Sequence, residues 1–244
     1  MNRLDALKSI RCVLTRTTHP GNIGGAARAL KTMGLESLYL VAPREFPSAD
    51  ADARAAGAAD LLRNASVCAS LEEALTGTTF AIGCTARRRE LSHPVVDARH
   101  AAVELLDAAR GGEVALVFGP EASGLTNAEL GACQRLATID ADPAYGSLNL
   151  ACAVQVFAYE IRMALELPAA RAESAGAPAT HEQLEAFYRH FEEVALAIGY
   201  LDAERPGLMM QRIRRLFARA RPEREEINLL RGMLKSAASV RARK

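Results

Sequence analysis

The sequence predicts an α/β domain built on a parallel sheet, followed by a small helical domain. Short apolar runs alternate with helical patterns through the first two thirds of the chain, and Gly, Pro and polar residues mark the junctions. The remaining third carries helical patterns alone. Alternation at this spacing is typical of a parallel sheet with helices on both faces. A chain of 244 residues has room for one such domain and an appendage, or for two small domains.

Short apolar runs bounded by turn residues predict the strands of this sheet. The predicted strands span residues 10–14, 37–41, 65–68, 79–84, 113–118 and 137–139.

Helical patterns follow most of these runs, and characteristic residues mark their ends. Gly34 ends the first helix, Ser70 and Glu73 form a capping box at the second, and Thr126 caps another. The alanine-rich stretch 51–62 is left unassigned. In the first domain the predicted helices span residues 24–33, 71–75, 97–109, 127–133 and 148–166.

Residues 167–180 have no apolar periodicity, which predicts a linker. The linker separates a first domain, residues 1–166, from an extension, residues 181–244. Pro206 and Pro222 lie at predicted helix starts, where proline is tolerated. The predicted helices of the extension span residues 181–198, 206–219 and 223–240.

The charge of the chain is distributed unevenly. Its net charge is +1, yet residues 205–244 carry +9 and residues 1–204 carry −8. A basic segment on an acidic body favours a polyanionic partner such as nucleic acid. The alternative is a solvated helix surface that happens to be rich in Arg.

Neither a secretion signal nor a membrane span is expected. Charges occupy the N-terminal residues, and no uncharged apolar stretch approaches roughly 18 residues. The five cysteines are scattered without a Cys-x-x-Cys pair, so neither a disulfide framework nor a metal site is predicted. Free thiols are consistent with a cytoplasmic protein.

Ligands of parallel sheets bind at the carboxyl ends of the strands. The four loops expected there are rich in Gly, Pro and polar residues, and they span residues 15–25, 85–93, 119–126 and 140–149.

The first candidate segment, residues 19–28, reads HPGNIGGAAR and joins a strand to a helix. Glycines at such a turn can bring backbone N–H groups close to an anion. Arg28 lies within about a turn of the helix start, where a guanidinium can donate two hydrogen bonds to one phosphate. Taken alone, the glycines fit a tight structural turn and Arg28 fits a surface salt bridge.

The second candidate segment, residues 117–130, reads VFGPEASGLTNAEL. Gly119 could let a ligand lie against the backbone. Glu121 could accept hydrogen bonds from ligand hydroxyls or pair with an Arg, or it could be an exposed loop charge.

The third candidate segment, residues 145–154, reads YGSLNLACAV. A polar loop enters a helix that is apolar on nearly all sides, which predicts a buried helix or one in a subunit interface. Ser147 and Asn149 could cap this helix or contact a ligand.

In this order and spacing, the three segments resemble the three motifs of the SpoU branch of the SPOUT methyltransferases. Residues 22–34, 118–130 and 147–156 are similar to the first, second and third motif. Residues 214–232 resemble the C-terminal extension of the TrmJ subgroup, whose members methylate the 2′-hydroxyl of nucleotide 32 in the tRNA anticodon loop. The resemblance covers nearly the whole chain. Pro120 departs from it, because family members often carry Arg there.

This resemblance implies a Rossmann-like parallel-sheet domain with a C-terminal trefoil knot, which is a rare exception to ordinary connection rules. It also implies a homodimer with active sites near the subunit interface, S-adenosylmethionine as cofactor, and tRNA as substrate. The cofactor-binding residues it implies are Cys84, Thr85, Ala86, Gly119, Ile139, Gly146, Ser147 and Leu148. The RNA-contacting residues it implies are Asn22, Arg28, Glu121, Arg214, Arg215, Arg219 and Arg221.

The catalytic residues implied by the resemblance are Arg28, Ser147 and Asn149. A guanidinium stays protonated at neutral pH and is therefore a poor base. Arg28 is therefore expected to clamp a phosphate and stabilise the developing alkoxide, while phosphate or water takes the proton. A sulfonium methyl group is already activated, so no metal ion is required.

Three alternatives remain. The first is the same reaction on ribosomal RNA, against which the extension argues by resemblance. The second is an RNA-binding homologue without catalysis, against which Arg28 and the complete third motif argue. The third is an ordinary doubly wound nucleotide-binding enzyme, and the missing Gly-x-Gly-x-x-Gly and Walker loops weigh against it.

Overall fold

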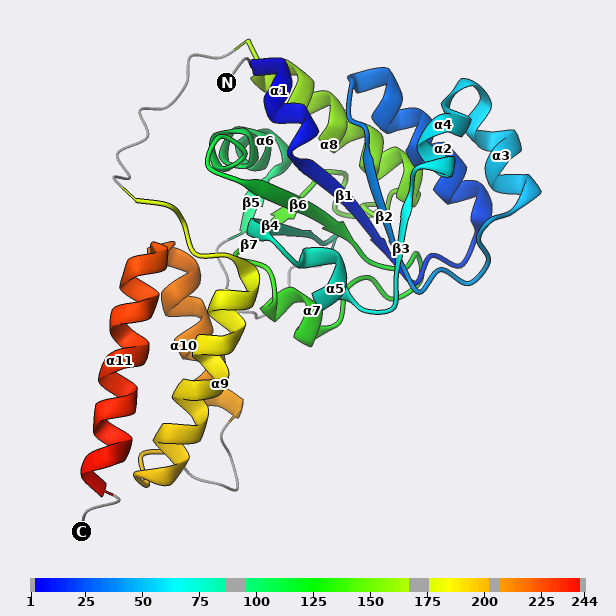
Figure 1. Ribbon diagram of the computed structural model, residues 1–244. Helices are drawn as coiled ribbons and strands as arrows, with labels where there is room; N and C mark the ends of the chain where they lie inside the picture. Colours follow the sequence, from blue (N-terminus) through cyan, green and yellow to red (C-terminus); the bar gives the residue numbers. More distant parts are fainter. Residues whose placement is uncertain (1–2, 87–94, 167–175, 202–206, 242–244) are drawn as a thin grey trace. The chain divides into compact units, whose positions relative to one another are not determined.

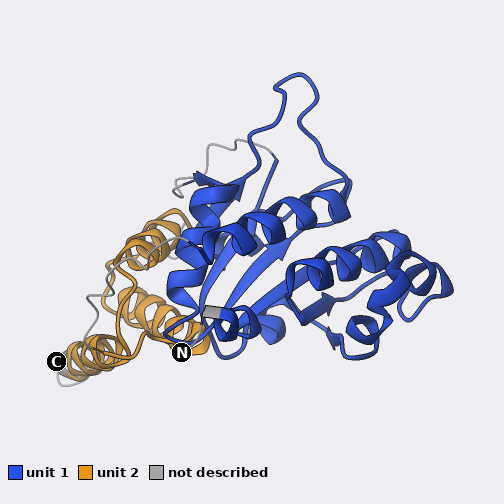
Figure 2. Ribbon diagram, turned by 90° about the horizontal axis from the view of Figure 1, so that it is seen from above, with its two compact units in different colours: residues 1–172 blue, residues 173–244 orange. Residues whose placement is uncertain are grey.

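A computed structural model describes residues 3–86, 95–166, 176–201 and 207–241. The chain forms two compact units, Met1–Ala172 and Glu173–Lys244, which Figure 2 distinguishes by colour. The first unit holds the sheet, and the described residues of the second form three helices.

The first unit contains a seven-stranded sheet with the order β3-β2-β1-β6-β4-β7-β5. All of its strand pairs are parallel. This confirms the predicted parallel α/β fold. The strands are β1 (Ile10–Thr15), β2 (Ser37–Val41), β3 (Ser66–Cys68), β4 (Thr78–Cys84), β5 (Val95–Asp97), β6 (Glu113–Phe118) and β7 (Arg135–Thr138).

Helices cover both faces of the sheet (Figure 1). Alternate residues of the central strands point to opposite layers, so Cys12 and Leu14 join the larger core cluster whereas Val13 joins the smaller one. The larger cluster packs against α1 (Arg3–Lys8), α2 (Pro20–Met33), α3 (Ala49–Ala55), α4 (Ala59–Arg63), α6 (Ala98–Ala108) and α8 (Leu150–Ala164). The smaller cluster packs against α5 (Leu71–Leu75) and α7 (Asn127–Gly131).

Several elements differ from their predicted bounds. The alanine-rich stretch forms α3, a 3-10 turn (Ala56–Ala58) and α4. Helix α1 and strand β5 were not predicted; α1 spans six residues without the capping box that marked residues 71–75, and β5 spans only three residues. Helix α2 begins at Pro20 rather than at residue 24, since proline fits the first helical turn without an N–H.

The glycines of the first segment therefore lie inside α2 and not in an anion-binding turn. A Cβ on Gly24 would lie 2.0 Å from the Ala51 carbonyl oxygen, and a Cβ on Gly25 would lie 2.8 Å from the Ala151 Cβ. Both glycines let neighbouring helices approach α2 closely, so their role is packing.

The second unit is a bundle of α9 (His181–Ala197), α10 (Gly207–Ala220) and α11 (Arg224–Arg241). Its core gathers around Phe187, whose ring lies 4.7 Å from that of Phe217.

Residues 176–180 of the predicted linker pack into this second unit. Ala179 N–H donates to the Pro222 carbonyl at 3.0 Å, and Arg224 N–H donates to the Ala177 carbonyl at 2.9 Å. Backbone pairing holds this stretch in place despite its lack of apolar periodicity. The rest of the predicted linker, residues 167–175, lies outside the described residues.

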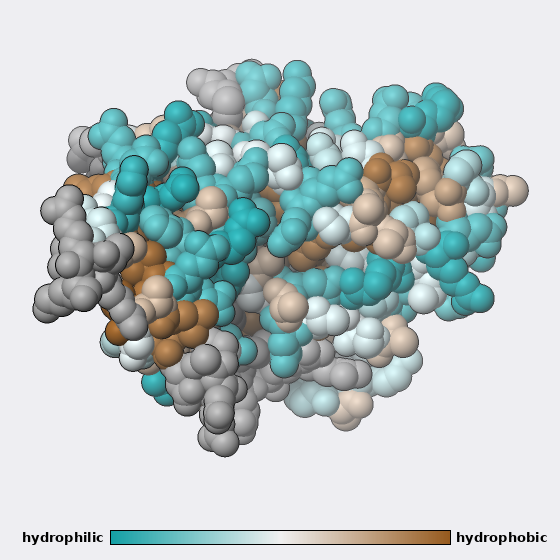
Figure 3. Space-filling view, turned by 60° about the horizontal axis from the view of Figure 1, so that its bottom comes forward, coloured by the Kyte–Doolittle hydropathy of each residue, from teal (hydrophilic) through white to brown (hydrophobic). Residues whose placement is uncertain are grey.

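Within the described residues, no helix combines the length and apolarity that a membrane span requires. The face drawn in Figure 3 is largely hydrophilic, and its hydrophobic residues form separate patches. The trefoil knot stays a prediction, since strand order and register leave the threading of the chain untested.

Candidate active site

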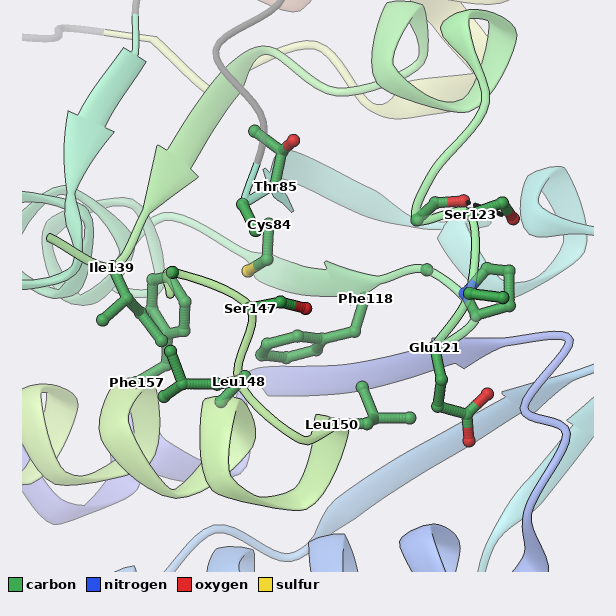
Figure 4. A pocket seen from close by; sticks show the side chains of 17 residues that line it. Cys84, Thr85, Phe118, Glu121, Ser123, Ile139, Ser147, Leu148, Leu150 and Phe157 are labelled. Carbon is green, nitrogen blue, oxygen red and sulfur yellow. Dashed lines mark hydrogen bonds between the residues drawn. The ribbon is translucent and has the colours of Figure 1, made fainter. Parts of the chain in front are cut away.

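A pocket opens at the carboxyl edge of the sheet (Figure 4). Strands β4, β6 and β7 end beside it, and the loops that follow them form its walls. All eight residues predicted to bind the cofactor line this pocket. The other lining residues are Phe118, Pro120, Glu121, Ala122, Ser123, Gly124, Leu150, Ala153 and Phe157.

One side of the pocket is apolar. The Phe118 and Phe157 rings meet edge to face with centroids 5.7 Å apart, and both side chains are buried. Ile139 and Leu148 lie beside them (Figure 4). Ser147 is exposed, and Figure 4 shows its hydroxyl pointing into the space bordered by Cys84 and Phe118. The pocket therefore offers an apolar surface with hydroxyl groups at its rim.

The backbone path of the pocket wall leaves room only for glycine at position 119. A Cβ there would lie 2.2 Å from the Leu125 nitrogen and 2.3 Å from the Gly124 carbonyl carbon. The loop returns on itself, and Gly124 N–H donates to the Pro120 carbonyl at 2.9 Å. Close approach of backbone to backbone is enough to explain this glycine.

Glu121 lines the pocket with its stem, while its carboxylate points away from Ser147 (Figure 4). One carboxylate oxygen accepts from Thr18 N–H at 3.0 Å and from Thr18 Oγ1 at 2.7 Å. The other accepts from Asn22 Nδ2 at 2.7 Å and from His19 N–H at 3.3 Å. A carboxylate has about four lone-pair sites. All four are occupied by these donors, and the contact of Glu121 with RNA stays a prediction.

These hydrogen bonds also set the charge of Glu121. Desolvation by burial raises the pKa of its carboxyl, but the bonds from Asn22 and Thr18 outweigh that effect and lower the pKa to about 2. Glu121 is therefore ionised at neutral pH and is a poor proton acceptor.

Asn22 joins Glu121 to the third motif. Its Oδ1 accepts from Asn149 Nδ2 at 2.8 Å, and Asn149 Oδ1 accepts from Ala151 N–H at 2.9 Å. Asn149 is thus the N-cap of α8, as one of the two interpretations of the third segment expected. The predicted residues Asn22, Glu121 and Asn149 form one hydrogen-bonded chain across the three motifs.

A second carboxylate anchors the loop after β1. Glu129 caps α7 by accepting from Thr126 N–H at 2.7 Å, and it also binds both terminal nitrogens of Arg16. Burial raises the pKa of Glu129, but the hydrogen bonds from Arg16 and Thr126 lower it more. This ion pair fixes Arg16, which has a left-handed φ of 46°, against α7.

Arg28 lies outside the pocket. Its side chain is exposed on α2, and no hydrogen bond or ion pair joins it to another described residue. It lies six residues beyond Asn22, which corresponds to about 9 Å along a helix. The structure therefore leaves the guanidinium accessible to a ligand without placing it among the pocket's lining residues.

The four predicted RNA-binding arginines of the second unit differ in their surroundings. Arg214 binds Glu185 with both terminal nitrogens and lies 4.4 Å over the Tyr188 ring. Its charge is paired inside the bundle, which gives Arg214 a structural role, and its contact with RNA stays a prediction. Arg219 and Arg221 are exposed, and Arg215 is half-buried.

Sequence reasoning missed two residues at this edge. Thr18 donates twice to Glu121, and its only signal in the sequence was a hydroxyl in the loop 15–25, which was predicted to lie at the carboxyl edge of the sheet. Phe157 completes the apolar side of the pocket from within α8, two turns beyond the third motif's polar residues. Helical periodicity marked it as apolar but could not show which cavity it borders.

The residues around this pocket suit a nucleoside-containing ligand. Its apolar side matches a flat base, its hydroxyls match polar substituents, and its backbone-lined walls allow close approach. The pocket thus fits S-adenosylmethionine.

Comparisons with known proteins agree with this description. Residues 9–159 match the SpoU rRNA Methylase family, and residues 182–244 match the C-terminal domain of tRNA methyltransferase TrmJ. The tRNA (cytidine/uridine-2'-O-)-methyltransferase TrmJ of Cronobacter sakazakii is 47% identical over 98% of this chain and 99% of its own. The tRNA (cytidine/uridine/adenosine-2'-O-)-methyltransferase TrmJ of Pseudomonas aeruginosa is 46% identical over 96% and 95%.

Solved structures show the same relationship. TrmJ from Z. mobilis superposes with a TM-score of 0.80 at 32% identity, covering 93% of this chain and 97% of its own. The SpoU methyltransferase AviRb from Streptomyces viridochromogenes, solved with AdoMet, shares the fold at 21% identity and a TM-score of 0.51, covering 62% and 58%. The chain therefore belongs to the SpoU methylase family of S-adenosylmethionine-dependent methyltransferases, and to the TrmJ group within that family.

Proposed function

We propose that this enzyme methylates the 2′-hydroxyl of cytidine or uridine in tRNA, at nucleotide 32 of the anticodon loop. The observation that carries the proposal is the extent of its similarity to TrmJ proteins. The relative from Cronobacter sakazakii matches both units of the chain over 98% of its length, including the basic extension. Position 32 is the site that the motif resemblance implies.

The cofactor is proposed to occupy the pocket at the carboxyl edge of the sheet. S-adenosylmethionine supplies an activated methyl group on a sulfonium when bound. Its base would lie against the apolar side formed by Ile139, Leu148 and Phe157, and its polar groups would meet Ser147 and Thr85. The walls that would hold it comprise Cys84, Thr85, Ala86, Gly119, Ile139, Gly146, Ser147 and Leu148.

Arg28 is proposed to hold the phosphate next to the reactive ribose and to stabilise negative charge on the 2′ oxygen. Its exposed guanidinium carries five N–H donors in a fork that matches phosphate. Ser147 is proposed to hydrogen bond the ribose from the pocket rim. Asn149 supports Arg28 and Ser147 indirectly, because it caps α8 and orients the Asn22 side chain. Phosphate or water takes the proton, because the Glu121 carboxylate is saturated.

A homodimer is proposed across the outer face of α8. Exposed or half-buried apolar side chains follow that helix at helical spacing, namely Cys152, Val156, Tyr159 and Met163. Tyr159 is 48% exposed and Met163 is 39% exposed, which is unusual for large apolar residues in a row. Helix α2, with Arg28, packs directly on α8 at Gly25, so this interface would lie close to Arg28.

The second unit is proposed to bind the RNA backbone through Arg215, Arg219 and Arg221. Positive charge on exposed helical residues attracts phosphates without regard to sequence, and such binding weakens steeply with salt. Arg212 is exposed on the same helix as Arg219 and is added to this set.

Transfer of a labelled methyl group to tRNA tests the proposal. The wild-type enzyme should modify tRNA, and replacing nucleotide 32 by its 2′-deoxy form should abolish labelling. Arg28→Ala should lose about a hundredfold or more in rate, with Arg28→Lys partly active. The matched control is Arg54→Ala, since Arg54 is an exposed helical arginine with only a 3.8 Å surface contact to Asp50.

The outcomes separate the alternatives. Labelling of ribosomal RNA in preference to tRNA would establish the first alternative. Absence of S-adenosylmethionine binding by calorimetry would establish an inactive homologue. Near-full activity in Arg28→Ala would refute the catalytic assignment of Arg28.

A further inference from the structure

Thr18 is the residue that fixes Glu121. It lies in the loop between β1 and α2 and donates to a single carboxylate oxygen through both its backbone N–H and its hydroxyl, at 3.0 and 2.7 Å. This leaves the other oxygen to accept from Asn22.

The ionised carboxylate gives the hydrogen-bonded chain one direction. A carboxylate only accepts, so Asn22 must present its NH2 group to Glu121. The Asn22 carbonyl oxygen then faces Asn149, which must donate through its own NH2 group at 2.8 Å. The remaining Asn149 oxygen accepts from Ala151 N–H and caps α8. Each orientation follows from the one before it.

This chain connects two opposite walls of the pocket. Glu121 belongs to the wall formed by residues 119–124, and Asn149 directly follows the wall formed by residues 146–148. The two segments are far apart in the sequence, and Asn22 of α2 is hydrogen-bonded to both of the residues that flank or form these walls, Glu121 and Asn149. The separation of the walls therefore depends on how Glu121 is held.

We infer that Thr18 is a positioning residue for the cofactor pocket, acting through Glu121, Asn22 and Asn149 to set the separation of its two walls. The inference rests on the proposed function, in which this pocket holds S-adenosylmethionine. Thr18 does not line the pocket, so its effect on the cofactor is indirect.

The chain offers a matched control in the neighbouring residue. Thr17 is 1% exposed, and its hydroxyl has no hydrogen-bond partner in the described structure. Thr17→Val and Thr18→Val make the same chemical change at adjacent positions of one loop. Only the second removes a hydrogen bond to a charged group, and Thr18→Ser restores that bond.

The experiment measures the dissociation constant of S-adenosylmethionine by calorimetry, the KM of each substrate, and the melting temperature. Thr18→Val should weaken cofactor binding about tenfold and raise the KM for S-adenosylmethionine in parallel. The KM for tRNA should stay within about twofold of wild type. Thr18→Ser and Thr17→Val should bind the cofactor within about twofold of wild type. Thr18→Ala also removes the hydroxyl and keeps the backbone N–H, as Thr18→Val does, and it serves as a second test of the lost hydroxyl.

The inference is overturned if Thr18→Val and Thr18→Ala bind the cofactor as wild type does. It is also overturned if Thr17→Val weakens binding equally, or if Thr18→Ser fails to restore it. A wild-type enzyme that binds S-adenosylmethionine but modifies no tRNA would refute the proposed function alone, because calorimetry still tests Thr18.

Discussion

Replacement of Gly119 by alanine tests how the pocket wall is built. The added Cβ would lie 2.2 Å from the Leu125 nitrogen and 2.3 Å from the Gly124 carbonyl carbon, whereas ordinary contacts begin at 3.4 Å. Both contacted atoms are backbone, so no side chain can rotate away. The loop must move by about 1 Å, and we take the upper end of the usual cost of overpacking, about 3 kcal/mol.

Such a loss has two measurable consequences. In a unit of this size, about 3 kcal/mol lowers the melting temperature by roughly 6–12 °C. Binding of S-adenosylmethionine should weaken by about tenfold or more, since the displaced residues line the pocket. Thermal unfolding followed by circular dichroism measures the first quantity, and calorimetry measures the second.

Gly131 provides the control for this experiment. It ends α7, and a Cβ built there meets nothing within 4 Å. Gly131→Ala should melt within about 2 °C of wild type and bind the cofactor normally. A Gly119→Ala protein that melts within about 1 °C of wild type and keeps its cofactor affinity would refute the reasoning.

Three further predictions concern the charged groups. Hydrogen bonds lower the pKa of Glu121 from 4.5 to about 2, so the stability it provides is complete above about pH 5 and is lost as the pH falls toward 2. The stability difference between wild type and Glu121→Gln in urea should therefore shrink between pH 6 and pH 3, and a constant difference would contradict this. Arg16→Met leaves the Glu129 carboxylate, which is only 10% exposed, without its cation. The free energy of unfolding in urea should therefore fall by about 2 kcal/mol. An unchanged midpoint of urea unfolding would disprove this prediction. Arg214→Met should destabilise the second unit by about 2 kcal/mol, whereas Arg219→Met should preserve stability and weaken tRNA binding at low salt. Equal effects of the two on stability would argue against the internal role of Arg214.

Much of the fold could be predicted from local sequence. Alternating apolar runs and helical patterns indicated the parallel sheet, and its strand ends predicted where a site would lie. Every residue predicted to bind the cofactor lines the pocket at that edge. These features are local, because they depend on periodicity and on the residue types next to each strand end.

Elements without periodicity could not be predicted in this way. Helix α3 is rich in alanine, which favours helix but gives little contrast between buried and exposed faces, and α4 is only five residues long. Gly24 shows the same limit from the other side. In the sequence, Gly24 suggested a turn that binds an anion. Only the folded structure shows that Gly24 lets Ala51 of α3 approach α2 closely.

The sequence by itself determined which residues are present at the carboxyl edge, while the tertiary structure decided what each of them does. Glu121 and Arg214 both looked like groups available to RNA. In the folded protein, three donors from the β1–α2 loop and one from Asn22 of α2 saturate Glu121, and Glu185 with Tyr188 satisfies Arg214. The reason is physical: hydrogen bonds and ion pairs act over about 3 Å between side chains that lie far apart in sequence, so only folding determines which partners meet.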